Sequence, residues 1–332
     1  MLPPLPTSAS RLLLTGAAGF IGSQVCEQLL AAGQPVYGID NLNDYYDPRI
    51  KHQRIAHLTA TYPHFQFSPL DIEDRAAINT LFATYHFTAV LNLAARAGVR
   101  YSLENPHVYL TTNGIGTLNL LEAMRAHGVK KFVLASTSSL YEGQPMPFVE
   151  TAPVNEPISP YAASKKAAEA LAYTYHRQFS LDVSIVRYFT VYGPASRPDM
   201  AVFRFIEWII RGQPVKILGD GTQSRDFTYV DDIASGTIAA LKPLGYEIIN
   251  LGGGQNPISL NQLISTLETL IGKKANCHYG TAHSADFKTN WADISKAARL
   301  LNWHPKISLT EGLTRSVTWH LQNRELLERC TF

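Results

Sequence analysis

Residues 12–24, LLLTGAAGFIGSQ, decide the fold, because a short apolar run leads through a glycine-rich turn into a helical pattern. Gly16, Gly19 and Gly22 follow the spacing G-x-x-G-x-x-G, one residue longer than the usual dinucleotide fingerprint. Glycines at such a turn allow backbone N–H groups to approach a pyrophosphate and allow the helix to pack closely on the sheet. A glycine triplet alone is also found in ordinary turns, so the neighbouring segments have to support this interpretation.

Strand-like and helix-like segments alternate beyond this turn. We predict strands over 11–15, 34–40, 65–71, 89–95, 131–137 and 181–194, and helices over 21–32, 74–84 and 106–127. This alternation indicates a parallel sheet covered by helices on both faces. Ligands of such sheets bind outside the carboxyl ends of the strands, where we expect Gly16, Asp40, Asp71, Ala94 and Thr137 to meet.

The pattern is less regular after residue 187. We predict helices near 200–211 and 259–271, a helix ending at about Leu241, and strands over 213–221 and 247–253. The expected fold is α/β: a Rossmann-type doubly wound parallel sheet with a smaller C-terminal substrate-binding α/β domain. Residues 1–187 would form the first domain, with segments near 229–253 returning to it, and residues 188–332 would mainly form the second.

Composition excludes several classes of partner. The 332 residues carry a net charge of +2, with 29 basic and 27 acidic side chains dispersed along the chain, which argues against a nucleic-acid partner. No run approaches the roughly 18 apolar residues of a membrane span, and no secretory leader is recognised. Three separated cysteines, Cys26, Cys277 and Cys330, suit neither a disulfide framework nor a zinc site. We therefore expect a cytoplasmic protein without a metal.

Two acidic residues end the second and third predicted strands. Asp40 lies 24 residues after Gly16, where a carboxylate binds both hydroxyls of an adenosine ribose and repels a 2′-phosphate. This favours NAD over NADP. Asp71 could accept a hydrogen bond from the adenine amino group or cap the helix over 74–84, and the sequence leaves both alternatives open.

Tyr161 and Lys165 stand four residues apart, on one face of a predicted helix. A tyrosine with its ordinary pKa of about 10 is a poor base at neutral pH. A neighbouring ammonium and the positive ring of an oxidised nicotinamide would lower that pKa. The glycine turn and the strand ending at Thr137 favour a catalytic role for Thr137, Tyr161 and Lys165 over two exposed helical side chains.

The segments TGAAGFIG (15–22), YAASK (161–165) and SRDFTYVDD (224–232) together resemble the extended short-chain dehydrogenase/reductase family. NLAARAGVRYSLENP (92–106) and FTVYGPASRPDMAVF (189–203) are similar to its nucleotide-sugar 4-epimerases, and among these to the UDP-glucuronate 4-epimerases. The resemblance covers nearly the whole chain. It implies an NAD-binding domain followed by a UDP-sugar-binding domain, and a homodimer built from helices over 106–127 and 161–178.

The resemblance also implies a reaction without net redox. Tyr161 would take the proton of the sugar 4-hydroxyl while a hydride leaves carbon 4 for NAD, and the hydride would return to the other face of the 4-keto sugar. Thr137 would orient the hydroxyl and Lys165 would assist Tyr161. The implied cofactor contacts are Gly16, Gly19, Phe20, Ile21, Gly22, Asp40, Asn41, Asp71, Ile72, Ala94, Ala95, Arg96, Asn113, Tyr161 and Lys165.

For the substrate, the resemblance places Arg225 at the UDP phosphates, where a planar donor fork suits a diphosphate. The other implied contacts are Arg100, Ser138, Ser139, Thr190, Arg197, Val215, Lys216, Leu218 and Asp286. Of these, Val215, Lys216 and Leu218 would lie near uracil and Asp286 near the uridine ribose. Arg197 could provide the cation that a buried 6-carboxylate requires, or it could support its own loop.

Three reactions can start from the same 4-keto intermediate. The related 4,6-dehydratases place Asp-Glu directly after the catalytic threonine, and related decarboxylases keep Glu at the second position, whereas this chain has Ser138 and Ser139. Serine is a poor general base without a partner. This favours epimerisation of UDP-glucuronate to UDP-galacturonate without decarboxylation. A UDP-glucose/UDP-galactose 4-epimerase and a catalytically silent NAD-binding regulator remain open.

The chain departs from the family pattern at three places. Ala195-Ser196 replaces a common Trp-Gly, Ala285-Asp286 replaces a common Gly-Asp, and His283 stands where some relatives have a phosphate-binding arginine. We expect these departures to affect the wall of the sugar pocket and the affinity for phosphate.

Overall fold

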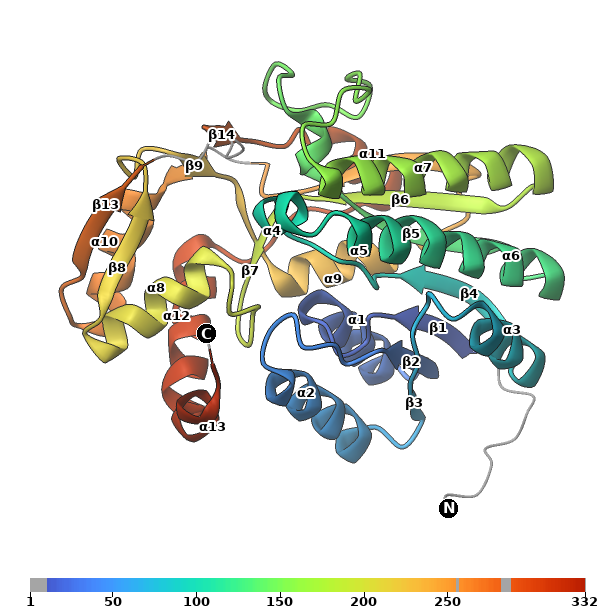
Figure 1. Cartoon of the computed structure of the whole chain (residues 1–332), viewed down its shortest axis with the longest axis horizontal. Helices are drawn as coiled ribbons and strands as arrows, with labels where there is room; N and C mark the ends of the chain where they lie inside the picture. Colours follow the sequence, from blue (N-terminus) through green and yellow to red (C-terminus); the bar gives the residue numbers. More distant parts are fainter. Residues whose placement is uncertain (1–10, 255–256, 282–287, 332) are drawn as a thin grey trace.

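The computed structural model describes residues 11–254, 257–281 and 288–331. Its centre is a seven-stranded parallel sheet in the order β11-β6-β5-β4-β1-β2-β3 (Figure 1). The strands are β1 (Arg11–Thr15), β2 (Val36–Asp40), β3 (Phe65–Pro69), β4 (Phe87–Asn92), β5 (Lys131–Thr137), β6 (Asp182–Tyr188) and β11 (Tyr246–Leu251). The doubly wound α/β fold is therefore confirmed.

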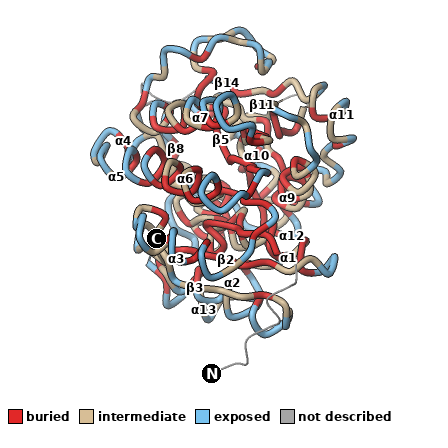
Figure 2. Tube along the Cα trace, turned by 90° about the vertical axis from the view of Figure 1, so that its right-hand side faces the viewer, coloured by how far each residue is buried: buried red, intermediate tan, exposed pale blue. Residues whose placement is uncertain are grey.

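Side chains along β1 alternate between the two faces of the sheet and so contribute to an apolar core on each face. Leu12 and Leu14 join an apolar core beneath α1 (Phe20–Ala31), α2 (Pro48–Thr61) and α9 (Val230–Ala239). Leu13 joins the core on the other face, beneath α3 (Arg75–Thr84), α6 (Thr117–His127) and α7 (Pro160–Phe179). Figure 2 shows the buried residues concentrated along the strands and the inner sides of these helices. A sheet buried on both faces explains why its strands are almost continuously apolar.

The helix expected over 106–127 is divided into three parts. After the short helix α4 (Val99–Glu104), the chain forms α5 (His107–Tyr109), a π-helical segment η1 (Leu110–Gly116) and then α6. Gly116 packs so tightly that an added Cβ would lie 2.5 Å from Cδ1 of Ile72. Asn113, inside the π-helical segment, bonds to the backbone of Arg96 at the cavity described below. Apolar periodicity identified the helix but not this change of pitch.

The strand expected over 181–194 is also divided, at Phe189. Its first part is β6 in the large sheet, and its second is β7 (Thr190–Tyr192), which pairs with β10 (Phe227–Tyr229). The other small strands are β8 (Pro214–Leu218) with β13 (Asn276–Gly280), and β9 (Ser224–Arg225) between β12 (Ile258–Ser259) and β14 (Thr289–Asn290). A 3-10 turn η2 (Ser138–Tyr141) follows β5, and the remaining helices are α8 (Ala201–Arg211), α10 (Leu260–Ile271), α11 (Ser295–Leu301), α12 (Leu309–Gln322) and α13 (Arg324–Arg329).

The end of the chain is joined to the loop after β2. The Thr331 N–H donates to Oδ2 of Asp47 at 3.0 Å, and Asp47 also caps α2 through the Arg49 N–H. Cys330 packs there with Ile50, Phe203 and Leu327. All three cysteines are free thiols. Within the described ranges, no helix has the length and apolarity for a membrane span, and no group of three metal-ligating side chains gathers.

Candidate active site

A cavity of about 440 Å³ opens at the carboxyl ends of β1, β2, β4 and β5. A second cavity of about 630 Å³ lies beside it, and both are lined by Thr190, Val191, Asp199, Met200 and Arg225. The sequence-predicted residues that line the first cavity are Gly16, Gly19, Phe20, Ile21, Gly22, Asp40, Asn41, Asp71, Ile72, Ala94, Ala95, Arg96, Thr137, Ser138, Ser139, Tyr161, Lys165, Thr190, Arg197 and Arg225. The fold therefore brings most of the predicted site together.

The glycine turn fits a dinucleotide, because it leaves no room for side chains. Gly16 has φ +73°, and an added Cβ would lie 2.7 Å from the Ala94 nitrogen. A Cβ on Gly22 would lie 2.0 Å from the Gly16 carbonyl oxygen. Helix α1 has Gly19 as its N-cap and no side-chain cap, so its first N–H groups point toward the cavity end without a side-chain acceptor. Such a helix start suits the pyrophosphate of NAD.

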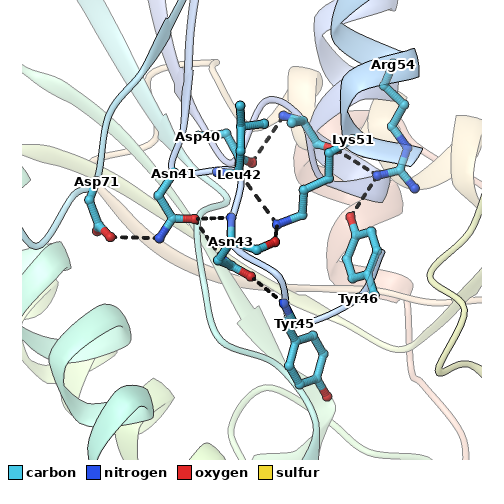
Figure 3. Close-up of polar contacts among 10 residues, drawn as sticks. Asp40, Asn41, Leu42, Asn43, Tyr45, Tyr46, Lys51, Arg54 and Asp71 are labelled. Atoms are coloured by element: carbon cyan, nitrogen blue, oxygen red, sulfur yellow. Dashed lines mark hydrogen bonds and ion pairs between the residues drawn. The ribbon is translucent and has the colours of Figure 1, made fainter. Parts of the chain in front are cut away.

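Asp40, the last residue of β2, forms a hydrogen-bonded network with the loop that follows it (Figure 3), and it lines the first cavity. Its carboxylate accepts from the N–H groups of Ala18, at 3.2 Å, and Leu42, at 2.8 Å. Nζ of Lys51 lies 3.9 Å from Oδ1 of Asp40 and donates to the Asn43 carbonyl at 2.8 Å. These contacts fix one acidic group at the end of β2, where an NAD ribose requires it.

Asp71 does not cap the helix over 74–84, so one of its two sequence interpretations is wrong. The N-cap of α3 is Asp74, which accepts from the Ala77 N–H at 3.0 Å. Asp71 instead accepts from Nδ2 of Asn41 at 2.7 Å and lines the cavity. Its position on the cavity wall agrees with the other interpretation, a hydrogen bond with the adenine amino group.

Arg54 lines neither cavity but is buried among residues that surround the first one, and the sequence did not reveal its role. Its Nη1 donates to the Ala18 carbonyl at 2.7 Å and to the Tyr46 hydroxyl at 2.8 Å (Figure 3). Its Nη2 donates to the Ala195 carbonyl at 2.5 Å. One guanidinium thus joins the glycine turn to the loop that carries Arg197. A basic residue on the inner face of α2 was the only sequence signal for it.

The three residues of the predicted triad come together where β5 ends and α7 begins. Thr137 is the last residue of β5, and α7 starts at Pro160 after its N-cap Ser159, whose Oγ accepts from the Ala162 N–H at 3.2 Å. Tyr161 and Lys165 both line the cavity. Nζ of Lys165 donates to the Ala135 carbonyl at 2.9 Å, which fixes the ammonium beside the end of β5.

Burial governs the proton affinity of this pair. The pKa of Tyr161 is raised by burial, while a hydrogen bond with Thr137 and the charge of Arg197 act to lower it. The pKa of Lys165 is lowered to about 8 by burial, against the opposing charge of Glu169. From the sequence we expect Lys165 to lower the pKa of Tyr161, but in the protein alone burial outweighs every such influence. The phenol therefore stays protonated at neutral pH until further positive charge enters the cavity.

A buried ion pair holds α7 against the sheet behind the triad. Glu169, on the same face of α7 as Lys165, accepts from Nε of Arg187 at 2.9 Å and from Nη2 at 2.7 Å. It also accepts from Oγ of Ser136 at 2.6 Å. Nη1 of Arg187 donates to the Tyr141 hydroxyl, which donates to Asn250. Because both charges are fully paired, this network can position the triad without exposing a charge.

Arg197 lies in the cavity near Tyr161 but already has an anionic partner. Its Nε and Nη2 donate to the two carboxylate oxygens of Asp199 at 2.9 and 2.5 Å. Its guanidinium carbon lies 5.5 Å from the ring centre of Tyr45, which comes from the loop after β2. The sequence predicted the position of Arg197 and missed both of these partners.

Five predicted residues lie elsewhere, and one lies outside the described ranges. Asn113 accepts from the Arg96 N–H and donates to the Arg96 carbonyl and to Ser164, so it supports the cavity wall without lining it. Arg100, Lys216 and Leu218 line the second cavity. Val215 lines neither cavity, because β8 alternates: its side chain is buried in the apolar core while Lys216 and Leu218 are exposed. Asp286, with His283 and Ala285, falls outside the described residues.

Replacement of Arg54 tests the connection between the glycine turn and the loop that carries Ala195 and Arg197. We expect Arg54→Met to lower the free energy of unfolding by about 2–4 kcal/mol, since the buried Ala18 carbonyl loses its partner. We also expect less nucleotide to remain bound after purification. Calorimetry and the absorbance of acid-released nucleotide measure the two effects, with Arg54→Lys as the charge-preserving control. A methionine variant that keeps wild-type stability and nucleotide content would refute this role.

Comparisons with known proteins agree with this geometry. Residues 12–252 match the model of the NAD dependent epimerase/dehydratase family. A UDP-glucuronate 4-epimerase of Thermodesulfobacterium geofontis is 61% identical over 316 residues, which are 95% of this chain and 98% of that protein.

Solved structures give the same result. The UDP-glucuronic acid 4-epimerase of Bacillus cereus, in complex with UDP-glucuronic acid and NAD, is 39% identical with a TM-score of 0.88, over 94% of this chain and 99% of that chain. The UDP-glucose 4-epimerase of Thermotoga maritima, with UDP-glucose, is 32% identical with a TM-score of 0.85, over 95% and 99% of the two chains. The glycine turn, the triad and these similarities together establish that the chain belongs to the NAD dependent epimerase/dehydratase family.

Proposed function

We propose that the protein interconverts UDP-glucuronate and UDP-galacturonate by NAD-dependent 4-epimerisation. The observation that carries the proposal is the composition of the cavity around Tyr161, where Ser138, Ser139 and Arg197 gather beside the triad. The 61% identity to a UDP-glucuronate 4-epimerase supports the same substrate. Residues 1–187 with 229–253 would mainly serve NAD, and residues 188–332 would mainly serve the UDP-sugar.

The triad residues provide the proton transfers of this reaction. Bound NAD supplies the hydride acceptor and donor for carbon 4. With the positive charge of the oxidised cofactor in the cavity, Tyr161 would lose its proton, and the phenolate would then remove the proton of the 4-hydroxyl and later return it. Thr137 bonds to the phenol and would orient the hydroxyl. Lys165, with a pKa of about 8, remains largely protonated at neutral pH and keeps positive charge beside the reacting group. Epimerisation requires no further acid or base.

The second cavity is suited to the nucleotide end of the substrate. Arg225 lines both cavities, so its guanidinium can bind the diphosphate that would pass between them. Arg100, Lys216 and Leu218 line the part farther from the triad, where uracil would lie. With this arrangement the sugar, and not the base, would lie beside Tyr161.

A uronate carboxylate in the first cavity needs compensating donors. A guanidinium has five N–H donors, and Asp199 uses two of those of Arg197. The remaining donors of Arg197, with the hydroxyls of Ser138 and Ser139, can bind the carboxylate and hold it out of the orientation in which the breaking carbon–carbon bond overlaps the ketone. We propose that this restraint prevents decarboxylation of the 4-keto intermediate.

One observation favours a second candidate, UDP-glucose 4-epimerase. The ion pair with Asp199 already neutralises Arg197, which weakens the argument that its charge requires an anionic sugar. A neutral 6-hydroxyl would also fit a cavity lined by serines.

Separate incubations with UDP-glucuronate and UDP-glucose distinguish the candidates. We expect UDP-galacturonate to be the main product of the first reaction, with slow or no turnover in the second. Chromatography that resolves the epimers and UDP-pentose measures both. Tyr161→Phe is the catalytic control and should lower kcat by about a hundredfold or more. Rapid turnover of UDP-glucose alone would overturn the uronate assignment.

Arg197→Ala tests the control of the carboxylate. We expect the KM for UDP-glucuronate to rise about tenfold and UDP-pentose to appear, because a charge-assisted contact is lost. Asp199→Asn is the matched control: it keeps Arg197 and removes only the competing carboxylate, so the uronate preference should persist. If Arg197→Ala leaves activity, product and preference unchanged, Arg197 does not bind the carboxylate.

We also propose a homodimer in the cytoplasm. Leu103, Leu110 and Ile115 are large apolar side chains about half exposed, and they lie on α4 and η1, which both pack against α7. Packing of these helices against a second copy would bury them. Three free thiols, two of them buried, suit a reducing compartment.

A charged substitution tests this interface. We expect Ile115→Asp to convert the dimer into a monomer, because a carboxylate would be buried at the helix contact. Light scattering coupled to size-exclusion chromatography gives the mass. The exposed Leu321 on α12 offers the control Leu321→Asp, which should remain dimeric. A wild-type monomer, or dimers of both variants, would contradict the proposed surface.

A further inference from the structure

Asn290 reaches the sugar end of the cavity from a distant part of the chain. It ends β14, yet its Nδ2 donates to Oγ of Ser138 at 3.0 Å, across 152 residues of sequence. Both side chains are buried, with 4% and 6% of their surfaces exposed, and both line the first cavity. The sequence offered no motif that linked these two residues.

This hydrogen bond leaves the hydroxyl proton of Ser138 available for another acceptor. A serine hydroxyl has one proton to donate and accepts through its lone pairs. The amide of Asn290 donates to Oγ of Ser138, and Ser138 donates no hydrogen bond to another of the residues that the structure describes. The hydroxyl therefore keeps its proton for a group inside the cavity. If Asn290 were the acceptor, the Ser138 hydroxyl would donate its proton to Asn290 and could not donate it to a ligand.

The backbone holds Asn290 in register with the phosphate end of the site. β14 pairs in parallel with β9, so that Asn290 lies opposite Arg225. The Asp226 N–H donates to the Asn290 carbonyl at 3.0 Å, and the Phe148 N–H donates to the next carbonyl, that of Trp291, at 2.8 Å. A strand fixed at both points can hold the amide of Asn290 against Ser138 without help from the substrate.

We propose that Asn290 is a positioning residue that holds Ser138 as a hydrogen-bond donor to the carboxylate of the uronate. The inference rests on the proposed function, because it assumes a carboxylate at carbon 6. A charge-assisted hydrogen bond is shorter and stronger than one to a neutral hydroxyl. Asn290 thus favours a uronate over a neutral hexose, although it acts through Ser138.

Binding and kinetics of the NAD-loaded protein test this inference. Asn290→Leu has a similar side-chain volume and no donor, and we expect it to raise the KM for UDP-glucuronate about tenfold. UDP-glucose, which differs only at carbon 6, serves as a competitive inhibitor, and its inhibition constant should change by less than about twofold. Ser138→Ala should give a similar rise, and the double variant should be no worse than either single variant.

Three results would overturn the inference. If Asn290→Leu weakened the binding of UDP-glucose and UDP-glucuronate equally, Asn290 would have only a structural role. Additive effects in the double variant would show that Asn290 does not act through Ser138. A wild-type KM in Asn290→Asp would show that Asn290 accepts from Ser138, since an aspartate cannot donate. Failure of the proposed function itself would be visible separately, as wild-type protein that does not epimerise UDP-glucuronate.

Discussion

The contact between the start of α1 and the ends of β1 and β4 is the constraint on which the site depends. An added Cβ on Gly16 would collide with the Ala94 backbone, and one on Gly22 would collide with the Gly16 carbonyl. Because the turn has no side chains at these points, α1 begins directly against the sheet edge. Its N–H groups, Asp40 and the residues after β4 then surround one cavity. A larger residue at either glycine would separate the cofactor end from the triad.

Polar groups buried behind this edge hold the triad in position. The Glu169–Arg187 pair fixes α7 to β6 and β5, and the hydroxyl of Ser136, one residue before Thr137, donates to the same carboxylate. Burial of this kind is costly unless every charge is paired, and here each has its partner. The same low-polarity surroundings raise the pKa of Tyr161 and lower that of Lys165. Rigid placement and altered proton affinity therefore have one physical origin.

Long-range contacts connect the residues around the first cavity to segments after residue 187. Arg54 joins the glycine turn to Ala195, Tyr45 lies against Arg197, and Asn290 contacts Ser138. Each contact joins a residue before residue 187 to one after it.

The sequence by itself predicted the parallel sheet, the glycine turn and the meeting of Asp40, Asp71, Ala94 and Thr137 at one sheet edge, because each depends on local periodicity or on residues at strand ends. The family resemblance supplied most of the other predicted residues that line the cavity. It also placed Arg197 and Arg225 in the cavity through their motifs. The sequence could not determine the inward direction of Val215, the Asp74 cap that displaced Asp71, or the π-helical turn at Asn113, since these depend on register and packing. Only the tertiary structure decided the partners of Arg54, Arg197 and Ser138, because those hydrogen bonds join segments whose separation in sequence carries no information about their distance in space.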